Sequence, residues 1–164
     1  MKSTNNFSIV SGGQTGVDRA ALDFSLSNGL VCRGWCPQGR LAEDGFINMR
    51  YPLSETNSVE TAVRTELNVM DSDATLIIYA DEMDSGTSAT KDFAFEHRKP
   101  LFVWRLSLNN NVRSFWKWLA ENKVGCLNIA GPRASQAANI YGETLDLLDV
   151  LLQEMVKESD QRFY

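Results

Sequence analysis

Ser11-Gly12-Gly13-Gln14-Thr15-Gly16-Val17-Asp18-Arg19 follows directly on the apolar run Phe7–Val10. An apolar strand, a glycine-rich turn and a helix in this order are typical of α/β folds that bind anions. Glycines let the backbone turn sharply and approach a ligand closely, and the first N–H groups of the following helix face the turn. The stretch contains neither the Gly-Lys-Ser/Thr of a Walker A loop nor a G-x-G-x-x-G fingerprint. It therefore predicts a phosphate-binding turn of another kind, with a tight turn that binds nothing as the alternative.

The composition is that of a globular protein with one domain. The chain has 164 residues, of which 43% are hydrophobic and 23% charged, and its formal net charge is −5. This charge argues against a strong non-specific nucleic-acid binder. No apolar stretch approaches the roughly 20 residues of a membrane span, and Met1–Asn6 is polar and lacks a signal-peptide core. We therefore expect a cytoplasmic protein without membrane or nucleic-acid partners, with residues 1–164 as a single domain.

Cysteine and histidine are scarce in this chain. The three cysteines Cys32, Cys36 and Cys126 are too few for a disulfide scaffold, and His97 is the single histidine. No metal-ligand spacing occurs, which favours plain buried thiols and argues against a metal site formed by the protein. His97 ends a predicted helix, where a structural role is favoured.

Apolar runs and amphipathic segments alternate along the sequence. Runs that predict strands cover residues 7–11, 30–35, 74–80, 100–106 and 126–130. Segments that predict helices cover residues 16–28, 58–70, 87–97, 112–122 and 134–157, followed by a frayed tail. Segment 36–53 has no regular period and reads as a long functional loop. The aromatic helix 112–122 fits either the core or a subunit interface.

This alternation predicts the fold class. Strands that alternate with helices imply βαβ units with right-handed crossovers and a mostly parallel sheet. We predict a three-layer Rossmann-like α/β fold with about five strands and helices on both faces. Ligands of such sheets bind at the carboxyl ends of the strands.

Three strand-to-helix turns should meet at that edge, namely residues 11–18, 84–88 and 128–133. Each combines glycine with hydroxyl, backbone N–H or arginine donors, which suits a ligand with a phosphate and a polar ring or ribose. The candidate ligand-binding residues are Gly12, Gly13, Gln14, Thr15, Gly16, Arg19, Arg40, Ser85, Gly86, Thr87, Gly131 and Arg133. Arg40 belongs to the long loop, where it could lie over a planar ring.

Some side chains remain open to two interpretations. Asp18 and Glu43 are the candidate catalytic carboxylates, although Asp18 could also bind ribose hydroxyls or stabilise a helix N-terminus. Arg19 could bind an anion or form a surface ion pair. Arg64, Thr65 and Asn68 share one face of a predicted helix, which either contacts the ligand or is solvated.

Longer motifs make the chain resemble the putative molybdenum carrier family. They cover residues 11–23, 34–45 (Gly34-Trp35-Cys36-Pro37-Gln38-Gly39-Arg40 at its start), 64–69, 72–77, 85–87 and 127–133. The resemblance implies a Rossmann-like fold related to the Lonely Guy and DNA-processing protein superfamily. Some relatives bind molybdenum cofactor, a pterin with a terminal phosphate, and form dimers or tetramers. The Lonely Guy motif Pro-Gly-Gly-x-Gly-Thr-x-x-Glu does not occur here.

We therefore expect a binding or carrier protein for a phosphorylated pterin or nucleotide-like ligand, with molybdenum cofactor (molybdopterin) as the leading candidate. Gly12, Gly13 and Gly16 would hold its phosphate, and its dithiolene would hold the metal. The alternatives are a nucleotide N-glycosidase that uses Asp18 or Glu43, and a sensor of a nucleotide signal. The resemblance also implies a homodimer or homotetramer.

Overall fold

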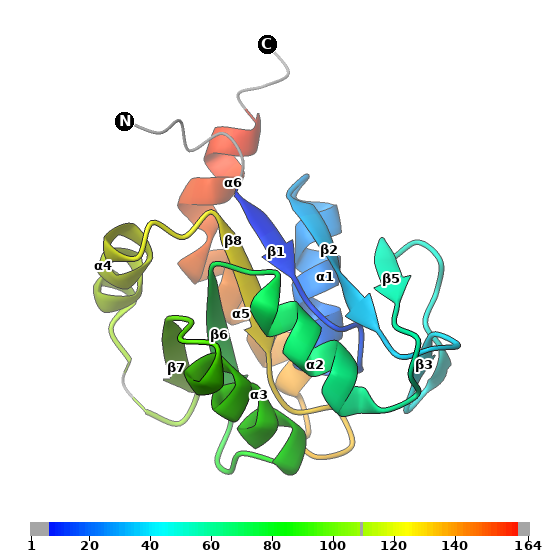
Figure 1. Cartoon of the computed structure of the whole chain (residues 1–164). Coiled ribbons are helices and arrows are strands. Elements are labelled where there is room, and N and C mark those ends of the chain that lie inside the picture. The colour runs from blue at the N-terminus through cyan, green and yellow to red at the C-terminus, as the bar shows by residue number, and fades with distance from the viewer. Residues whose placement is uncertain (1–6, 109, 161–164) are drawn as a thin grey trace.

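A computed structural model describes residues 7–108 and 110–160 (Figure 1). The predictions for Met1–Asn6 and for residues 161–164 of the tail lie outside this part. The strands of the central sheet are β1 (Ser8–Val10), β2 (Val31–Cys36), β5 (Leu53–Glu55), β6 (Ala74–Tyr79), β7 (Leu101–Arg105) and β8 (Cys126–Ala130). Their order is β5-β2-β1-β8-β6-β7, and each neighbouring pair is parallel. This confirms the predicted mostly parallel α/β fold.

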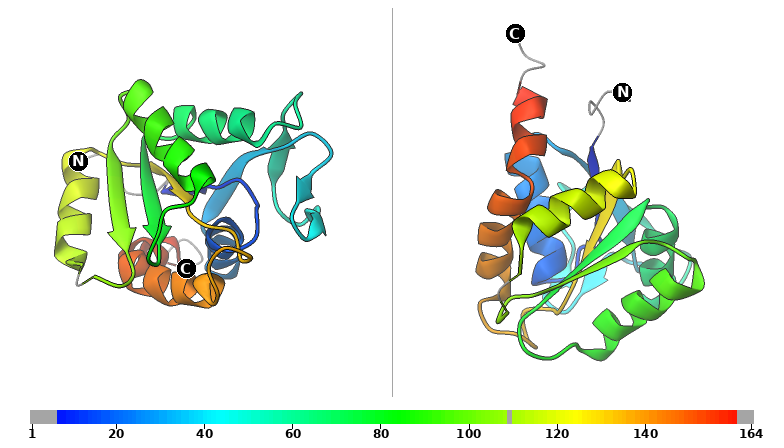
Figure 2. Two further views of the ribbon diagram at one scale, coloured as in Figure 1. Left: turned by 90° about the horizontal axis from the view of Figure 1, so that it is seen from below. Right: turned by 90° about the vertical axis from the view of Figure 1, so that its left-hand side faces the viewer.

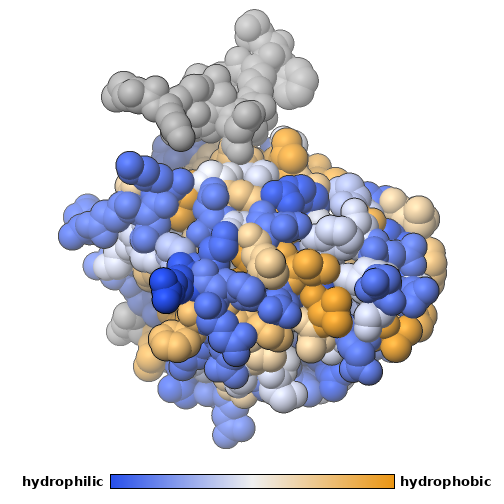
Figure 3. Space-filling view, in the orientation of Figure 1, coloured by the Kyte–Doolittle hydropathy of each residue, from blue (hydrophilic) through white to orange (hydrophobic). Residues whose placement is uncertain are grey.

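Helices cover both faces of this sheet. They are α1 (Val17–Ser27), α2 (Thr61–Met70), α3 (Ser85–Glu96), α4 (Val112–Glu121), α5 (Ile140–Leu151) and α6 (Gln153–Asp160). Figure 2 shows α2 and α3 on one face, and α1 and α5 on the other. Helix α4 packs against α5. Hydrophilic side chains cover most of the face that carries α2 and α3, with apolar side chains in small groups among them (Figure 3).

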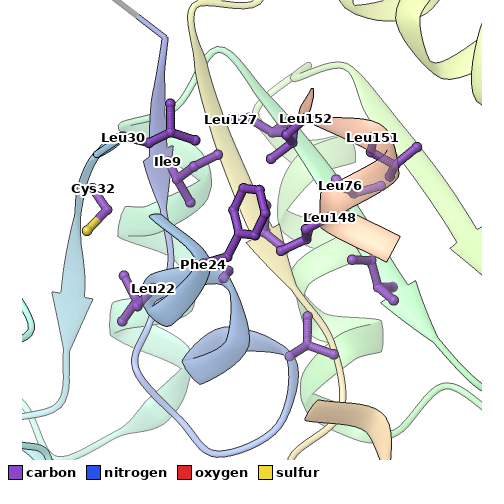
Figure 4. Packing of buried hydrophobic residues seen from close by; sticks show 14 of the residues in the cluster. Ile9, Leu22, Phe24, Leu30, Cys32, Leu76, Leu127, Leu148, Leu151 and Leu152 are labelled. Atoms are coloured by element: carbon purple, nitrogen blue, oxygen red, sulfur yellow. The ribbon is translucent and has the colours of Figure 1, made fainter. Parts of the chain in front are cut away.

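The hydrophobic core lies between the sheet and the helices. Phe24 of α1 points toward the sheet, where Ile9 and Leu127 lie beside it (Figure 4). Leu148 of α5, a helix on the same face of the sheet, lies next to the Phe24 ring. Residues 74–78 of β6 are all buried, as expected for a strand between two layers of helices. No helix in residues 7–108 and 110–160 is long and apolar enough to cross a membrane.

Two predictions about secondary structure need correction. Segment 36–53 contains the antiparallel hairpin β3 (Leu41–Ala42) and β4 (Gly45–Phe46), and it leads into β5, which adds a sixth strand to the predicted sheet of about five. The predicted helix 134–157 is two helices, α5 and α6. Asn139 has a left-handed backbone with φ 62°, which stops α5 from beginning earlier, and the chain turns at the buried Leu152 between the two helices.

Candidate functional site

A cleft of about 160 Å³ lies at the carboxyl ends of β1, β6 and β8, between α1, α2, α3 and the turn that follows β8. The turns that lead into α3 and α5 lie at the same lower edge of the molecule in Figure 1. Ligand pockets commonly measure roughly 300–1,000 Å³, so this cleft is smaller than a typical pocket for a small-molecule ligand. The predicted residues that line the cleft are Gly12, Gln14, Asp18, Ser85, Gly86, Thr87, Gly131 and Arg133.

The first turn of α3 forms one wall of the cleft. Asp84 caps this helix, and its carboxylate accepts a hydrogen bond from the Thr87 N–H at 2.7 Å. The N–H groups of Ser85 and Gly86 lie in the same turn, and N–H groups at this position have no acceptor within the helix. The turn also carries the positive end of the helix dipole. Thr87 is 2% exposed, and its buried hydroxyl has no hydrogen-bond partner in the described part of the chain. This wall therefore offers donors to an anion.

A buried ion pair forms another wall. Asp18 of α1 is 4% exposed, and its Oδ2 lies 2.9 Å from Nη1 of Arg64 of α2. Burial raises the pKa of the Asp18 carboxyl, while the charge and hydrogen bond of Arg64 and the Gln14 N–H lower it. Nε of Arg64 is buried without a hydrogen-bond partner among residues 7–108 and 110–160. A Cβ on Gly12 would lie 1.6 Å from Nη1 of Arg64, so this glycine makes room for the guanidinium.

The N-terminus of α1 does not face the cleft in the way the sequence predicts. The Val17 N–H donates to the carbonyl of Pro132 at 3.2 Å, and a Cβ on Gly16 would lie 2.3 Å from the same oxygen. The Thr15 hydroxyl donates to Glu43 and accepts from the Ala134 N–H. The turn after β8 therefore occupies the position where the sequence predicted a phosphate, because the two turns pack backbone against backbone.

Gly13 and Arg19 stabilise the long loop. Arg19 donates to the Gly13 carbonyl at 2.9 and 3.1 Å and forms an ion pair with Asp44 at 3.0 Å. Gly13 has φ 80°, and a Cβ there would lie 2.5 Å from the Leu53 side chain. Neither residue lines the cleft.

Arg40 also lies outside the lining of the cleft. The structure places its guanidinium inside the loop, where it is 4% exposed and donates to backbone carbonyls between residues 47 and 53. Its donors are therefore directed at the chain itself and away from the predicted planar ring.

Glu43, the second candidate catalytic residue, joins the β3–β4 hairpin to the turn after β8. Its carboxylate accepts from the Ser135 N–H at 3.1 Å and from the hydroxyls of Ser135 and Thr15, and it lies 3.5 Å from Nε of Arg133. Glu43 does not line the cleft, although Arg133 does. Its position therefore indicates an attachment point for the hairpin.

The titration of Glu43 offers a test of this attachment. Hydrogen bonds from Ser135 and then Thr15 lower its pKa below the ordinary 4.5. Because the folded pKa is lowered, the stability that Glu43 contributes is present above pH 4.5 and is lost as the pH falls through the lowered pKa. We expect carboxyl-carbon NMR to give a midpoint below 4.5 that moves upward in Ser135→Ala. A midpoint of 4.5 or higher in the unchanged protein contradicts the attachment.

The sequence did not decide whether one face of α2 contacts the ligand or is solvated. In the structure, Arg64, Thr65 and Asn68 of this face line the cleft. The amide of Asn68 exchanges hydrogen bonds with the backbone of Trp35, which gives it a structural role. Thr61, Thr90 and Gln136 also line the cleft and were missed. Thr61 shares its helix face with Arg64 and Thr65 by spacing, whereas nothing in the local sequence distinguishes Thr90 or Gln136.

Comparison with known proteins supports the fold and identifies the family. A crystal structure named Putative molybdenum carrier protein, from Syntrophus aciditrophicus SB, is 41% identical and has a TM-score of 0.86. The similarity covers 90% of this chain and 96% of that chain. A comparison with curated proteins finds no match. The family model described as Circularly permutated YpsA SLOG family matches residues 9–152. Since this match spans most of the chain and the fold agrees with the solved relative, the chain belongs to the circularly permutated YpsA SLOG family.

Proposed function

We propose that the chain binds a phosphorylated pterin or nucleotide-like ligand in the cleft, with the phosphate at the first turn of α3. The observation that carries this proposal is the hydroxyl of Thr87, which is buried in the cleft wall without a partner in the described residues. Leaving a buried hydroxyl unpaired costs about 1–3 kcal/mol, which a phosphate oxygen would recover. Arg133, 45% exposed at the other side of the cleft, adds a positive charge.

Molybdenum cofactor is the leading candidate ligand, since the relative from Syntrophus aciditrophicus SB carries the name of a molybdenum carrier. The cleft suits such a cargo in two respects. Thr87 and the N–H groups beside it would hold the terminal phosphate, and the Asp18–Arg64 pair offers an acceptor and donors to the polar edge of the pterin. The metal would stay on the pterin's own dithiolene and need no protein ligand.

The proposal is tested by native mass spectrometry of the purified chain with molybdenum cofactor, AMP and GMP added separately. We expect at least one of these ligands to be retained, and the same spectra report the homodimer or homotetramer that we propose. If none is retained at millimolar concentration, the proposal fails. Appearance of ribose 5-phosphate and free base would instead indicate a nucleotide N-glycosidase.

A matched pair of variants tests the position of the phosphate. Thr87→Val should weaken binding of the retained ligand roughly 10- to 150-fold, the equivalent of one hydrogen bond to a charged group. Thr144→Val is the control, because the buried hydroxyl of Thr144 also has no hydrogen-bond partner among the described residues but lies in α5 outside the cleft. Both variants should be at least as stable as the unchanged chain, since each loses an unpaired buried hydroxyl. Equal affinity in the two variants would contradict a phosphate site at Thr87.

A further inference from the structure

The Asp18–Arg64 pair has more hydrogen-bonding capacity than its contacts within the protein use. A carboxylate offers about four acceptor sites, and the groups that hydrogen bond to that of Asp18 are Nη1 of Arg64 and the Gln14 N–H. A guanidinium has five N–H donors, and Nε of Arg64 is buried without a partner among the described residues. Both side chains line the cleft. The two side chains are therefore adjacent in one wall, one with unused acceptor sites and the other with an unused donor.

A carboxylate next to a guanidinium selects a ligand edge that presents N–H donors to the carboxylate and an acceptor to the guanidinium. A carboxylate accepts two parallel N–H bonds from a ring N–H and its neighbouring amino group, while a guanidinium donates to a ring carbonyl. A 2-amino-4-oxo ring, as in guanine and pterin, presents these three groups in a row. Adenine presents an unprotonated ring nitrogen to the carboxylate and no carbonyl to the guanidinium.

We propose that Asp18 and Arg64 recognise the 2-amino-4-oxo edge shared by guanine and pterin, so that the cleft prefers ligands with this edge over adenine. The inference rests on the proposed function, since it assigns the ring while Thr87 holds the phosphate. Burial of the pair makes the preference strong, because a mismatched ring would cover the remaining acceptor sites of the carboxylate and the Nε donor of the guanidinium without pairing them, and would cut them off from water.

The first test uses the unchanged protein and four nucleotides in isothermal titration calorimetry. We expect GMP to bind at least about tenfold more tightly than AMP, with IMP, which lacks the 2-amino group, in between. Deoxy-GMP should bind as tightly as GMP. Equal affinity for AMP and GMP overturns the inference, and so does a loss with deoxy-GMP as large as that with AMP, which would assign Asp18 to the ribose. Competition of GMP by neopterin would identify pterin as a second accepted ring.

The second test compares two aspartates of α1. Asp18→Asn should abolish the preference for GMP over AMP, because asparagine has a donor NH2 in place of one acceptor oxygen and cannot accept two parallel N–H bonds. Asp23→Asn is the control. Asp23 lies on the same helix as Asp18 but does not line the cleft, and it pairs instead with Arg50 of the long loop at 2.6 Å. Equal strengthening of GMP and AMP in Asp18→Asn would overturn the inference, because Asp18 would then only repel phosphate. Should both nucleotides bind equally to the unchanged chain and weaken in Thr87→Val, the ring assignment fails while the proposed function stands.

Discussion

Replacement of Arg40 by methionine is expected to lower the free energy of unfolding by about 3–5 kcal/mol. The guanidinium of Arg40 is buried and donates to four backbone carbonyls. Its Nε lies 3.0 Å from the carbonyl oxygen of Ile47, and its Nη1 lies 2.9 Å from the carbonyl oxygen of Leu53. Nη2 lies 3.0 Å from the carbonyl of Asn48 and 2.9 Å from that of Tyr51. Methionine fills a similar volume but donates no hydrogen bond, so these carbonyls must stay unpaired or the loop must open to water.

Urea unfolding measures this loss, with Arg50→Met as the control from the same loop. The Arg50 side chain is 60% exposed and pairs with Asp23, so its replacement should cost no more than about 1 kcal/mol. Arg40→Lys should rescue only part of the loss, because one ammonium cannot reproduce the planar fork that reaches four oxygens. A cost for Arg40→Met equal to that of Arg50→Met would contradict the structural role of Arg40.

Arg40 also illustrates what the sequence could not predict. An arginine in a glycine- and proline-rich loop has the same local signature whether it binds a ligand or the loop itself. The difference lies in carbonyls 7–13 residues away, whose directions depend on the folded loop. The prediction that Arg40 closes over a ligand ring thus rested on residue type alone.

The order of strands and helices, by contrast, was open to prediction. β6 and β8 are mostly apolar runs, interrupted only by Thr75 and Asn128, and the predicted strand 126–130 has the bounds of β8. Their burial under two layers of helices produces this pattern directly. β5 has only three residues, two of them exposed, and pairing with β2 defines it. Such a short edge strand leaves no periodicity in the sequence.

The meeting of three turns at one edge followed from the parallel sheet, and the cleft contains residues from all of them. The sequence could not show which turn would remain open. Both the turn before α1 and the first turn of α3 combine glycine with hydroxyl donors, so their local patterns are equivalent. The backbone after β8 packs against the first, with the Pro132 carbonyl accepting from the Val17 N–H, and the first turn of α3 lines the cleft.

This packing predicts that Gly16→Ala lowers the free energy of unfolding by about 3–5 kcal/mol. Gly16 has φ 79° and ψ −128°, a conformation that strains an alanine by about 1–3 kcal/mol. Its Cβ would also lie 2.3 Å from the Pro132 carbonyl oxygen and 2.9 Å from the Ala134 nitrogen. Both are backbone atoms, so relief requires movement of the turn that carries Arg133, and ligand affinity should fall together with stability.

Substitutions at two other glycines serve as controls that distinguish backbone strain from steric overlap between a Cβ and the turn after β8. Gly29, just beyond the other end of α1, has φ 66°, and apart from its chain neighbours no described residue has an atom within 4 Å of the position that a Cβ would take, so Gly29→Ala should cost only about 1–2 kcal/mol. Gly142 lies within α5 with the same open space and without a positive φ, so Gly142→Ala should stabilise the chain by roughly 0.5–1 kcal/mol. Both glycines have a positive φ, so the cost at Gly29 in urea unfolding reports the strain of a positive φ alone. A cost at Gly16 that exceeds the roughly 1–3 kcal/mol of its own backbone strain measures the contact between the two turns. If Gly16→Ala costs no more than Gly29→Ala, the turn after β8 does not occupy the N-terminus of α1, and that helix end becomes available to a phosphate as the sequence predicted.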